Sequence, residues 1–284
     1  MARIVYLNGE WLEENEARVS VFDRGFLFAD AIYEVTAVIG GKLIDYAGHA
    51  ARLKRSLQAL DIPMPVEEGV LLSLHRDILT RNGMTDGLIY LQITRGAEDR
   101  DFLFSANLQP TFVMFTQAKS VLDNPRWKTG ISIVSRPDGR WANRHIKTVQ
   151  LLYSSLAKME AKKAGADDVF MVEDGLVTEA SSANAHIVTK DGVLVTRALS
   201  NALLHGITRG SILDLAARAG ISVEERSFSI EEAKAAAEVF ITSASAFVMP
   251  VVSIDGVTIG SGAPGPVSQK LLQIYIDDRL ATAI

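Results

Sequence analysis

The chain has 284 residues, 48% of them hydrophobic, so it can bury a substantial core as one large or two modest domains. A net charge of -5 excludes the extended basic surface that nucleic-acid binding requires. The lack of cysteine excludes disulfides and thiolate metal sites, and the five histidines have no ligand spacing, so we expect no metal.

The first half of the chain has the pattern of strands and two helices. Asn8-Gly9 lies between two apolar runs, which predicts a tight β-hairpin. The alternation from Ala31 to Ile39 predicts a strand with Tyr33 on one face and Glu34 on the other. Further periodicities predict helices at 46–60 and 66–81 and strands at 88–95 and 111–116.

The second half begins at about Trp127, after a stretch without periodicity that contains Pro125. Apolar residues at helical spacing, Val149, Leu152, Leu156 and Met159, predict a helix whose stripe packs in the core. We expect strands at 130–135, 168–172, 185–188, 193–196, 222–225 and 239–242 and helices at 207–219, 230–237 and 266–280.

This order of elements predicts an α+β protein with two domains. We place a small N-terminal domain at 1–118, an interdomain linker at 119–126 and a larger C-terminal domain of mixed strands and helices at 127–284. The amino terminus enters a strand pattern at once, and no stretch approaches about eighteen unbroken apolar residues, so we expect a cytoplasmic protein with no membrane partner.

Three features of the second half point to one chemistry. Lys147 immediately precedes the amphipathic helix, Glu179 heads a run of small residues, and Gly206-Ile207-Thr208-Arg209 opens a further helix. An amine forms a Schiff base with an aldehyde, a carboxylate keeps a ring nitrogen protonated, and the amides of a helix start receive a phosphate. Together these residue types indicate pyridoxal 5'-phosphate as cofactor.

A wider set of motifs carries a family resemblance. The runs Glu179 to Ala185, Leu194-Val195-Thr196 and Leu204 to Arg209 resemble the signature of the class IV aminotransferases, the fold-type IV pyridoxal phosphate enzymes. The similarity extends from Asn8-Gly9 to about Pro250-Val251. One departure is His186, where the family signature usually has Phe or Tyr. The resemblance implies two domains with the cofactor in the cleft between them, and a homodimer.

The resemblance also implies roles for single residues. Lys147 would form the Schiff base and later move a proton between the substrate Cα and the cofactor, which requires a neutral amine. Glu179 would pair with the ring nitrogen through a charge-assisted hydrogen bond. Arg52 matches the arginine that binds the cofactor phosphate, and Arg55 is a second choice.

Further residues match the cofactor pocket of the family. Ile207 and Thr208 would give the phosphate their backbone amides, and Thr208 also its hydroxyl. Ser243 and Ala244 align with a second phosphate-binding turn, where the family often has a hydroxyl at the position of Ala244. Leu204 matches the apolar residue that packs on one face of the ring.

The substrate residues match the family less closely. Tyr33 and Arg100 align with two members of the carboxylate trap of D-amino-acid aminotransferases, in which a tyrosine works with an Arg-x-His pair. Here the pair reads Arg100-Asp101-Phe102, so the histidine is missing and an acid lies beside the arginine. The resemblance implies that this loop reaches the site of the other subunit.

The leading hypothesis is therefore transamination between D-amino acids, such as D-alanine or D-glutamate, and 2-oxo acids. An R-amine or branched-chain L-amino-acid transaminase stays open because of Phe102. An aminodeoxychorismate lyase would use the same lysine and cofactor, and a catalytically silent relative is disfavoured by the presence of Lys147, Glu179 and Arg52.

Overall fold

The computed structural model describes residues 2–284, which form two compact units. Unit 1 contains the described residues up to Leu122, together with Ile146–Gln150 and Ala283–Ile284, and unit 2 contains Asp123–His145 and Leu151–Thr282. The junction after Leu122 falls inside the linker predicted at 119–126. The Lys147 segment, which was predicted in the C-terminal domain, belongs instead to unit 1, because its backbone bonds to a strand there.

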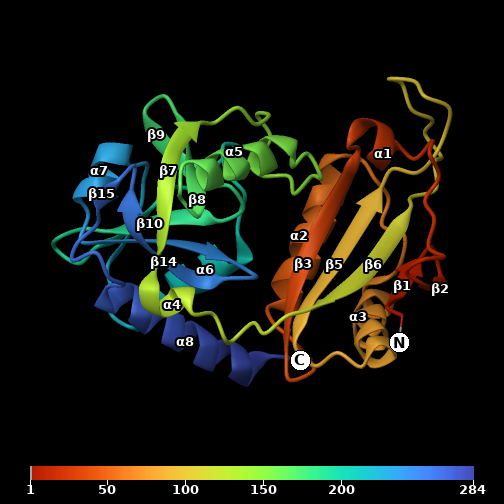
Figure 1. Ribbon diagram of the computed structural model, residues 1–284. Coiled ribbons are helices and arrows are strands. Elements are labelled where there is room, and N and C mark those ends of the chain that lie inside the picture. Colours follow the sequence, from red (N-terminus) through yellow and green to blue (C-terminus); the bar gives the residue numbers. More distant parts are fainter. Residues whose placement is uncertain (1) are drawn as a thin grey trace. The chain divides into compact units, whose positions relative to one another are not determined.

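Unit 1 is built on a six-stranded sheet whose paired strands are all antiparallel, in the order β2-β1-β6-β5-β3-β4 (Figure 1). Its elements are β1 (Ile4–Leu7), β2 (Glu10–Glu13), α1 (Arg24–Phe28), β3 (Ala31–Ile39), β4 (Lys42–Leu43), α2 (Tyr46–Ala59), α3 (Glu68–Asn82), β5 (Gly87–Thr94) and β6 (Phe112–Ala118).

The predicted hairpin and the predicted strand of unit 1 are both confirmed. Asn8 and Gly9 have φ of 49° and 100°, as a two-residue turn requires, and they join β1 to β2. The bounds of β3 are those expected from the alternation, and Glu34 is buried while Tyr33 is half-buried. The two faces of β3 therefore carry different groups of the site.

Unit 2 holds a nine-stranded mixed sheet in the order β12-β11-β10-β13-β14-β7-β8-β9, with β15 paired to β14 (Figure 1). Its elements are α4 (Arg126–Thr129), β7 (Ile131–Pro137), α5 (Leu152–Lys163), β8 (Asp168–Glu173), β9 (Leu176–Ala180), β10 (Asn184–Val188), β11 (Leu194–Thr196), α6 (Ile207–Arg218), β12 (Val223–Glu225), α7 (Ile230–Ala235), β13 (Glu238–Ser243), β14 (Phe247–Ile254), β15 (Val257–Thr258) and α8 (Pro266–Thr282).

The core of unit 2 lies on this sheet. Buried Ile133, Phe170, Ile187 and Ile241 come from four different strands and pack in one cluster that also contains Phe228. Helix α6 packs against β13, α8 packs against β13 and β14, and the two helices pack against each other. The mixed sheet of unit 2 and the antiparallel sheet of unit 1 confirm the predicted α+β class with two domains.

The predicted core stripe of α5 is wrong. Leu152, Leu156 and Met159 are 73%, 54% and 50% exposed, whereas the opposite face of the helix packs through Ala157 and Ala161 on β8. The small alanines bring the helix close to the strand, so the larger apolar side chains point away from it. The helical period was read correctly, but the face that meets the sheet is the other one.

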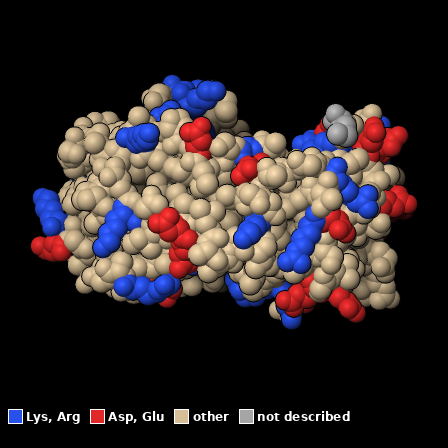
Figure 2. All heavy atoms as spheres, turned by 90° about the horizontal axis from the view of Figure 1, so that it is seen from below, with Lys and Arg blue, Asp and Glu red and all other residues tan. Residues whose placement is uncertain are grey.

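The charged side chains show no segregation on the face seen in Figure 2, where basic and acidic groups are interspersed. Among residues 2–284 no helix is long and apolar enough to cross a membrane.

Candidate active site

Lys147 is fixed to unit 1 by its backbone. The amide of Tyr33 donates to the Lys147 carbonyl at 3.0 Å, and the amide of Val149 donates to the Ala31 carbonyl at 3.1 Å. The Lys147 amide in turn donates to the Ser56 hydroxyl at 3.3 Å. The lysine segment therefore pairs with the start of β3 through an isolated bridge between Ile32 and Thr148, which sets the position of the Lys147 side chain.

The Lys147 amine lies over an aromatic ring. Its Nζ is 4.0 Å from the centroid of the Tyr33 ring, and that ring stacks on Tyr90 with a centroid distance of 5.6 Å. In the described part of the chain, no hydrogen bond or ion pair holds this Nζ. A half-buried amine without a carboxylate partner is suited to react with an aldehyde.

Arg52 lies on the buried stripe of α2, which carries polar residues where a plain core helix would carry apolar ones. Its Nε and Nη2 donate to the two oxygens of Glu34 at 2.7 and 2.8 Å, and His49 Nδ1 lies 2.8 Å from the same carboxylate. Burial alone would raise the pKa of Glu34, but Arg52 and His49 outweigh it and hold this pKa well below its usual range. Arg55, the second choice from the sequence, is exposed.

Glu179 is the buried carboxylate of unit 2, at the end of β9. It accepts hydrogen bonds from Arg140 Nη1 at 2.5 Å, from Asn184 Nδ2 at 3.1 Å and from the Leu204 amide at 3.2 Å. Burial raises the pKa of Glu179, and Arg140 opposes that rise. A cation placed against this carboxylate would favour its charged form further.

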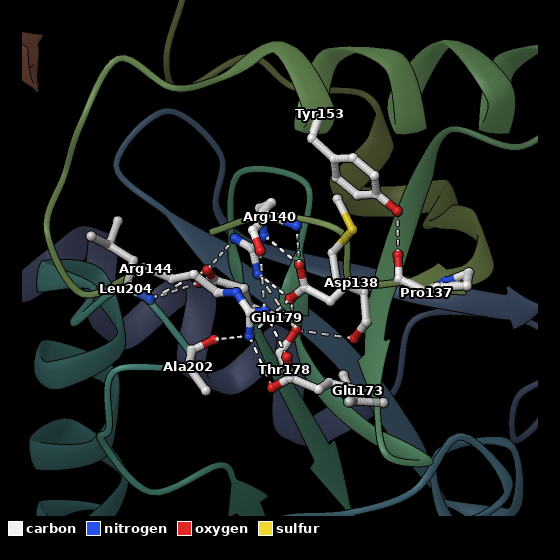
Figure 3. A network of polar contacts seen from close by, with 12 residues as sticks. Pro137, Asp138, Arg140, Arg144, Tyr153, Glu173, Thr178, Glu179, Ala202 and Leu204 are labelled. Atoms are coloured by element: carbon white, nitrogen blue, oxygen red, sulfur yellow. Dashed lines mark hydrogen bonds and ion pairs between the residues drawn. The ribbon is translucent and has the colours of Figure 1, made fainter. Parts of the chain in front are cut away.

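Arg140 belongs to a network that the sequence did not reveal (Figure 3). Its guanidinium bridges Glu179 and Asp138, whose Oδ2 lies 2.7 Å from Arg140 Nη2, and Thr178 Oγ1 also donates to Asp138 at 2.6 Å. Hydrogen bonds to Arg140 and Thr178 outweigh burial and lower the pKa of Asp138. The only local signal is Asp138-x-Arg140 directly after a strand, which is too short to specify a role.

Asn184 joins the carboxylate to the start of α6. Its Nδ2 donates both to Glu179 and, at 2.8 Å, to the Leu204 carbonyl. A Cβ on Gly206 would lie 1.9 Å from Asn184 Oδ1, so only glycine fits here. The N-cap Gly206 has no side chain to occupy the amides of the first helical turn, which begins with Ile207 and Thr208. This helix start has the donors that a phosphate needs.

The second predicted phosphate turn follows β13. Thr242 lies opposite Asn184 in the sheet, and the half-buried Ser243 and Ala244 come next. His186 lies on the neighbouring strand β10, two residues after Asn184. Its Nε2 is 2.9 Å from the Thr242 hydroxyl, and its ring stacks on that of Phe240 with a centroid distance of 4.7 Å. Burial lowers the pKa of His186 to about 3, so this departure from the family signature is a neutral core residue.

The predicted site residues thus form two groups. Tyr33, Arg52 and Lys147 lie in unit 1, where Tyr33 meets Lys147 directly. Glu179, Leu204, Ile207, Thr208, Ser243 and Ala244 lie in unit 2. Arg100 is exposed on the loop after β5, and among residues 2–284 no contact joins it to Tyr33.

Comparison with known proteins identifies the family. The model of the family "Amino-transferase class IV" matches residues 31–254. The chain belongs to the class IV aminotransferases. The predicted resemblance and the predicted cofactor, pyridoxal 5'-phosphate, are thereby confirmed, and the protein is a pyridoxal phosphate-dependent aminotransferase.

Several relatives of this aminotransferase cover nearly its whole length. A D-alanine aminotransferase of Bacillus licheniformis is 38% identical over 267 residues, 94% of each chain, and one of Staphylococcus aureus (strain N315) is 38% identical over 272 residues, again 94% of each. A D-alanine aminotransferase of Listeria innocua is 35% identical over 276 residues, 96% of this chain and 95% of the relative.

Solved structures confirm the predicted fold-type IV architecture. The branched-chain amino acid aminotransferase of Escherichia coli matches with a TM-score of 0.90 and 25% identity, over 98% of this chain and 95% of the other. A second branched-chain amino acid aminotransferase, from T.th. and complexed with N-(5'-phosphopyridoxyl)-L-glutamate, matches with a TM-score of 0.89 and 26% identity, over 99% and 95%.

Proposed function

We propose that this aminotransferase moves amino groups between D-amino acids, such as D-alanine or D-glutamate, and 2-oxo acids. The observation that carries the proposal is the anchored Glu179 carboxylate beside the glycine-capped start of α6, in a chain whose relatives at 34–38% identity are D-alanine aminotransferases. We further propose that the residues named from the sequence hold pyridoxal phosphate, which supplies an aldehyde and an electron-withdrawing ring.

In this proposal Lys147 binds the aldehyde and then moves a proton at the substrate Cα. The second task needs a neutral amine. The backbone bonds of Lys147 to β3 keep the side chain in place during both tasks. The adjacent Tyr33 ring limits the directions in which the amine can move.

Glu179 orients and charges the cofactor ring. Its bonds to Asn184 and the Leu204 amide fix the carboxylate, and Arg140 favours its ionised form. Leu204 would then pack on the ring whose nitrogen faces Glu179. With the cofactor bound, the carboxylate would hold a proton at the ring nitrogen through a charge-assisted hydrogen bond.

The phosphate is assigned to three groups of donors. Ile207 and Thr208 give their amides, and Thr208 its hydroxyl, at the positive end of α6. Ser243 at the end of β13 and the amide of Ala244 after it form the second group, and Arg52 contributes positive charge. Since Glu34 accepts from Arg52 through both of its oxygens, the orientation of the guanidinium is set before a phosphate arrives.

The substrate carboxylate is assigned to Tyr33 and Arg100. A guanidinium presents a planar fork of donors that matches a carboxylate. The main alternative, an R-amine or branched-chain L-amino-acid transaminase, is favoured by Phe102 in place of the trap histidine and by the branched-chain enzymes among the similar structures.

We also propose a homodimer in the cytoplasm. The exposed apolar side chains of α5, Leu152, Leu156 and Met159, support an interface between subunits. Large apolar groups exposed together in a single chain commonly mark such contacts. The absence of cysteine agrees with a reducing compartment.

The test is a panel of half-reactions. Enzyme loaded with pyridoxal phosphate is mixed with single D-amino acids, L-amino acids and R-amines, and the absorbance of the cofactor is followed. Conversion by D-alanine or D-glutamate at the highest kcat/KM supports the proposal. Preference for an L-amino acid or an R-amine would contradict it, and release of pyruvate without an amino acceptor would indicate the lyase.

A further inference from the structure

The loop that carries Arg100 is joined to the segment of α1. The Arg24 amide donates to the Gly96 carbonyl at 2.8 Å, and the Glu98 amide donates to the Phe22 carbonyl at 3.3 Å. Asp23 and Ala97 form an isolated β-bridge between the same two segments. In unit 1 the loop therefore leaves β5 beside α1 (Figure 1).

Arginines and aromatic rings alternate along this junction. We call the group of Arg95, Phe104, Arg24, Phe28, Arg100 and Phe102 the arginine–aromatic stack. The Arg95 guanidinium lies 3.8 Å from the Phe104 ring centroid, and Arg24 lies 5.2 Å from Phe104 and 4.5 Å from Phe28. At the outer end, Arg100 lies 5.3 Å from Phe28 and 5.7 Å from Phe102. The two outer rings meet edge to face at 5.7 Å.

The inner end of the arginine–aromatic stack is held by ion pairs. Asp30 Oδ2 accepts from Arg24 Nε at 3.0 Å and from Arg95 Nε at 2.7 Å, and both arginines are buried. Arg24 Nη1 also donates to the carbonyl of Asp101 at 2.7 Å. The backbone next to Arg100 is thus tied to a buried ion-pair cluster, so the loop has a defined position relative to the sheet.

The acids that flank Arg100 do not engage it. Asp101 Oδ1 accepts from the Leu103 amide at 3.0 Å, and within residues 2–284 no ion pair joins Arg100 to Asp99 or Asp101. Among residues 2–284, the groups that lie against the Arg100 guanidinium are the rings of Phe28 and Phe102. A ring that meets a guanidinium by its face leaves the N–H groups at the edge available to a carboxylate.

We propose that Phe28 and Phe102 are positioning residues that hold the Arg100 guanidinium in the orientation in which it binds the substrate carboxylate. Phe102 stands where the carboxylate trap of the family has a histidine, and it contributes the face of its ring instead of a hydrogen-bond donor. The inference rests on the proposed function, in which Arg100 binds that carboxylate. A histidine would supply one more donor, whereas a phenylalanine supplies a platform that fixes the orientation of the existing donors. The trap is then built from one arginine with two rings behind it.

The experiment compares three leucine variants of the loaded enzyme. Phe102→Leu and Phe28→Leu should each raise the KM for D-alanine and the inhibition constant of propanoate, which has the carboxylate but no amine, by roughly two- to fivefold. The kcat and the dissociation constant of the cofactor should stay unchanged. Phe102→Tyr, which keeps the ring face, should behave as the wild type.

The matched control is Phe26→Leu. Phe26 is a 74% exposed ring on the same helix, and no guanidinium of the described residues lies over it, so its loss should change neither constant. Because Phe102 is 79% exposed, its replacement removes little packing from unit 1. Equal effects of Phe26→Leu and Phe102→Leu would overturn the inference.

A double-mutant comparison separates the inference from the function on which it rests. In an Arg100→Ala background, Phe102→Leu should have no further effect on either constant, because the group it positions is gone. If Arg100→Ala raises both constants but the phenylalanine variants do not, the positioning role of Phe28 and Phe102 is refuted, while the role of Arg100 in binding the carboxylate is retained. The same conclusion follows if the effects of Arg100→Ala and Phe102→Leu multiply in the double mutant. If Arg100→Ala itself changes nothing, the assignment of Arg100 under the proposed function fails.

Discussion

Arg140 Nη1 lies 2.5 Å from Glu179 Oε1, and the same guanidinium is shared with Asp138. Burial favours a neutral group, but the two carboxylates outweigh it and raise the pKa of Arg140, so this residue stays cationic. The positive charge of Arg140 therefore lies between the carboxylates of Glu179 and Asp138. The Asn184 side chain and the Leu204 amide donate further hydrogen bonds to Glu179. Burial nevertheless raises the pKa of Glu179, and these partners reduce that rise without reversing it.

The first prediction concerns the charge of Glu179. Glu179→Gln keeps the shape but removes the charge that holds the ring nitrogen protonated, so the half-reaction with D-alanine should slow by about a hundredfold or more, about 2.7 kcal/mol. Stopped-flow absorbance measures the rate. Glu173→Gln changes a more exposed carboxylate of the same network, paired with Arg144, and should stay within about twofold. Equal rates in the Glu179 variant and the wild type would refute the ring-nitrogen role.

The second prediction concerns the lysine that binds the cofactor. After borohydride reduction, the cofactor should be attached to the Lys147 peptide, and Lys147→Ala should lose this attachment. The control is Lys158, eleven positions further along, whose Nζ is held at 3.0 Å by Asp168 in unit 2. Lys158→Ala should retain the attachment. Peptide mapping that places the cofactor on Lys158 would invalidate the assignment of the whole site.

The third prediction uses two glycines of one helix start. Gly206→Ala places a Cβ 1.9 Å from Asn184 Oδ1, so Asn184 must move away from Glu179 and Leu204, and the dissociation constant of the cofactor should rise by at least about tenfold. Gly210→Ala, one turn further on with nothing within 4 Å, should bind the cofactor normally and stabilise α6 by about 0.5–1 kcal/mol. Fluorescence titration measures cofactor binding, and thermal melts measure stability. Equal cofactor binding by both variants would exclude a role of Asn184 in holding Glu179 and the start of α6 in place.

Local patterns were sufficient for much of the fold. The period-2 alternation fixed the bounds of β3, and the Asn8-Gly9 pair fixed the first hairpin, because both depend on neighbours in the sequence. The strand β14 was not predicted. Pro250 lies in its middle and argues against a central strand, yet β14 pairs with β13 on one side and with β7 on the other. Just after Pro250, the register of the pairing between β14 and β7 shifts between Val251 and Ser253.

Sequence motifs predicted only part of the site. Lys147, Glu179 and the Gly206 run could be named because they stand in a recognisable order. The partners of these residues could not, since Arg140 and Glu179 are 39 positions apart and Arg52 and Glu34 meet through tertiary packing of α2 on β3. The α5 stripe failed for a related reason: helical spacing identifies an apolar face but not what that face meets.

The fourth prediction concerns acid stability. Because the folded state holds the pKa of Glu34 below its usual value of 4.5, the ionised carboxylate stabilises the fold above that pH, and this contribution is lost as the pH falls below it. Glu34→Gln should lose about 3–5 kcal/mol at pH 7, since Arg52 is left buried without its partner. Its melting temperature should then change less than that of the wild type between about pH 5 and pH 3.

The control for this experiment is an exposed ion pair. Glu14 pairs with Arg3 at side-chain exposures of 44% and 41%, so Glu14→Gln should cost less than about 1 kcal/mol and leave the pH dependence of the melting temperature as in the wild type. Circular dichroism melts from neutral to acid pH measure all three proteins. A Glu34→Gln protein that loses stability with acid as steeply as the wild type would contradict the assigned pKa shift.

The last prediction tests whether Arg100 acts on the site of the other subunit in the proposed homodimer. Neither Arg100→Ala nor Lys147→Ala should have full activity alone with D-alanine. When the two are mixed 1:1 and exchange subunits at random, half of the dimers are mixed. In each mixed dimer one site combines an intact Lys147 with an intact Arg100 from the partner, so about a quarter of wild-type activity should return.

Mixing wild type with a chain that carries both Arg100→Ala and Lys147→Ala gives the decisive comparison. If Arg100 serves the partner's site, the mixed dimers have no intact site, and only the wild-type dimers, about a quarter of the total, remain active. If Arg100 serves its own subunit, each mixed dimer keeps one intact site, and about half of the activity remains. An activity near one half in this mixture, or a monomeric enzyme with full activity, would refute the action of Arg100 on the partner's site. About one quarter in both mixtures requires that Arg100 acts on the partner's site, because a site built within a single subunit cannot give both values.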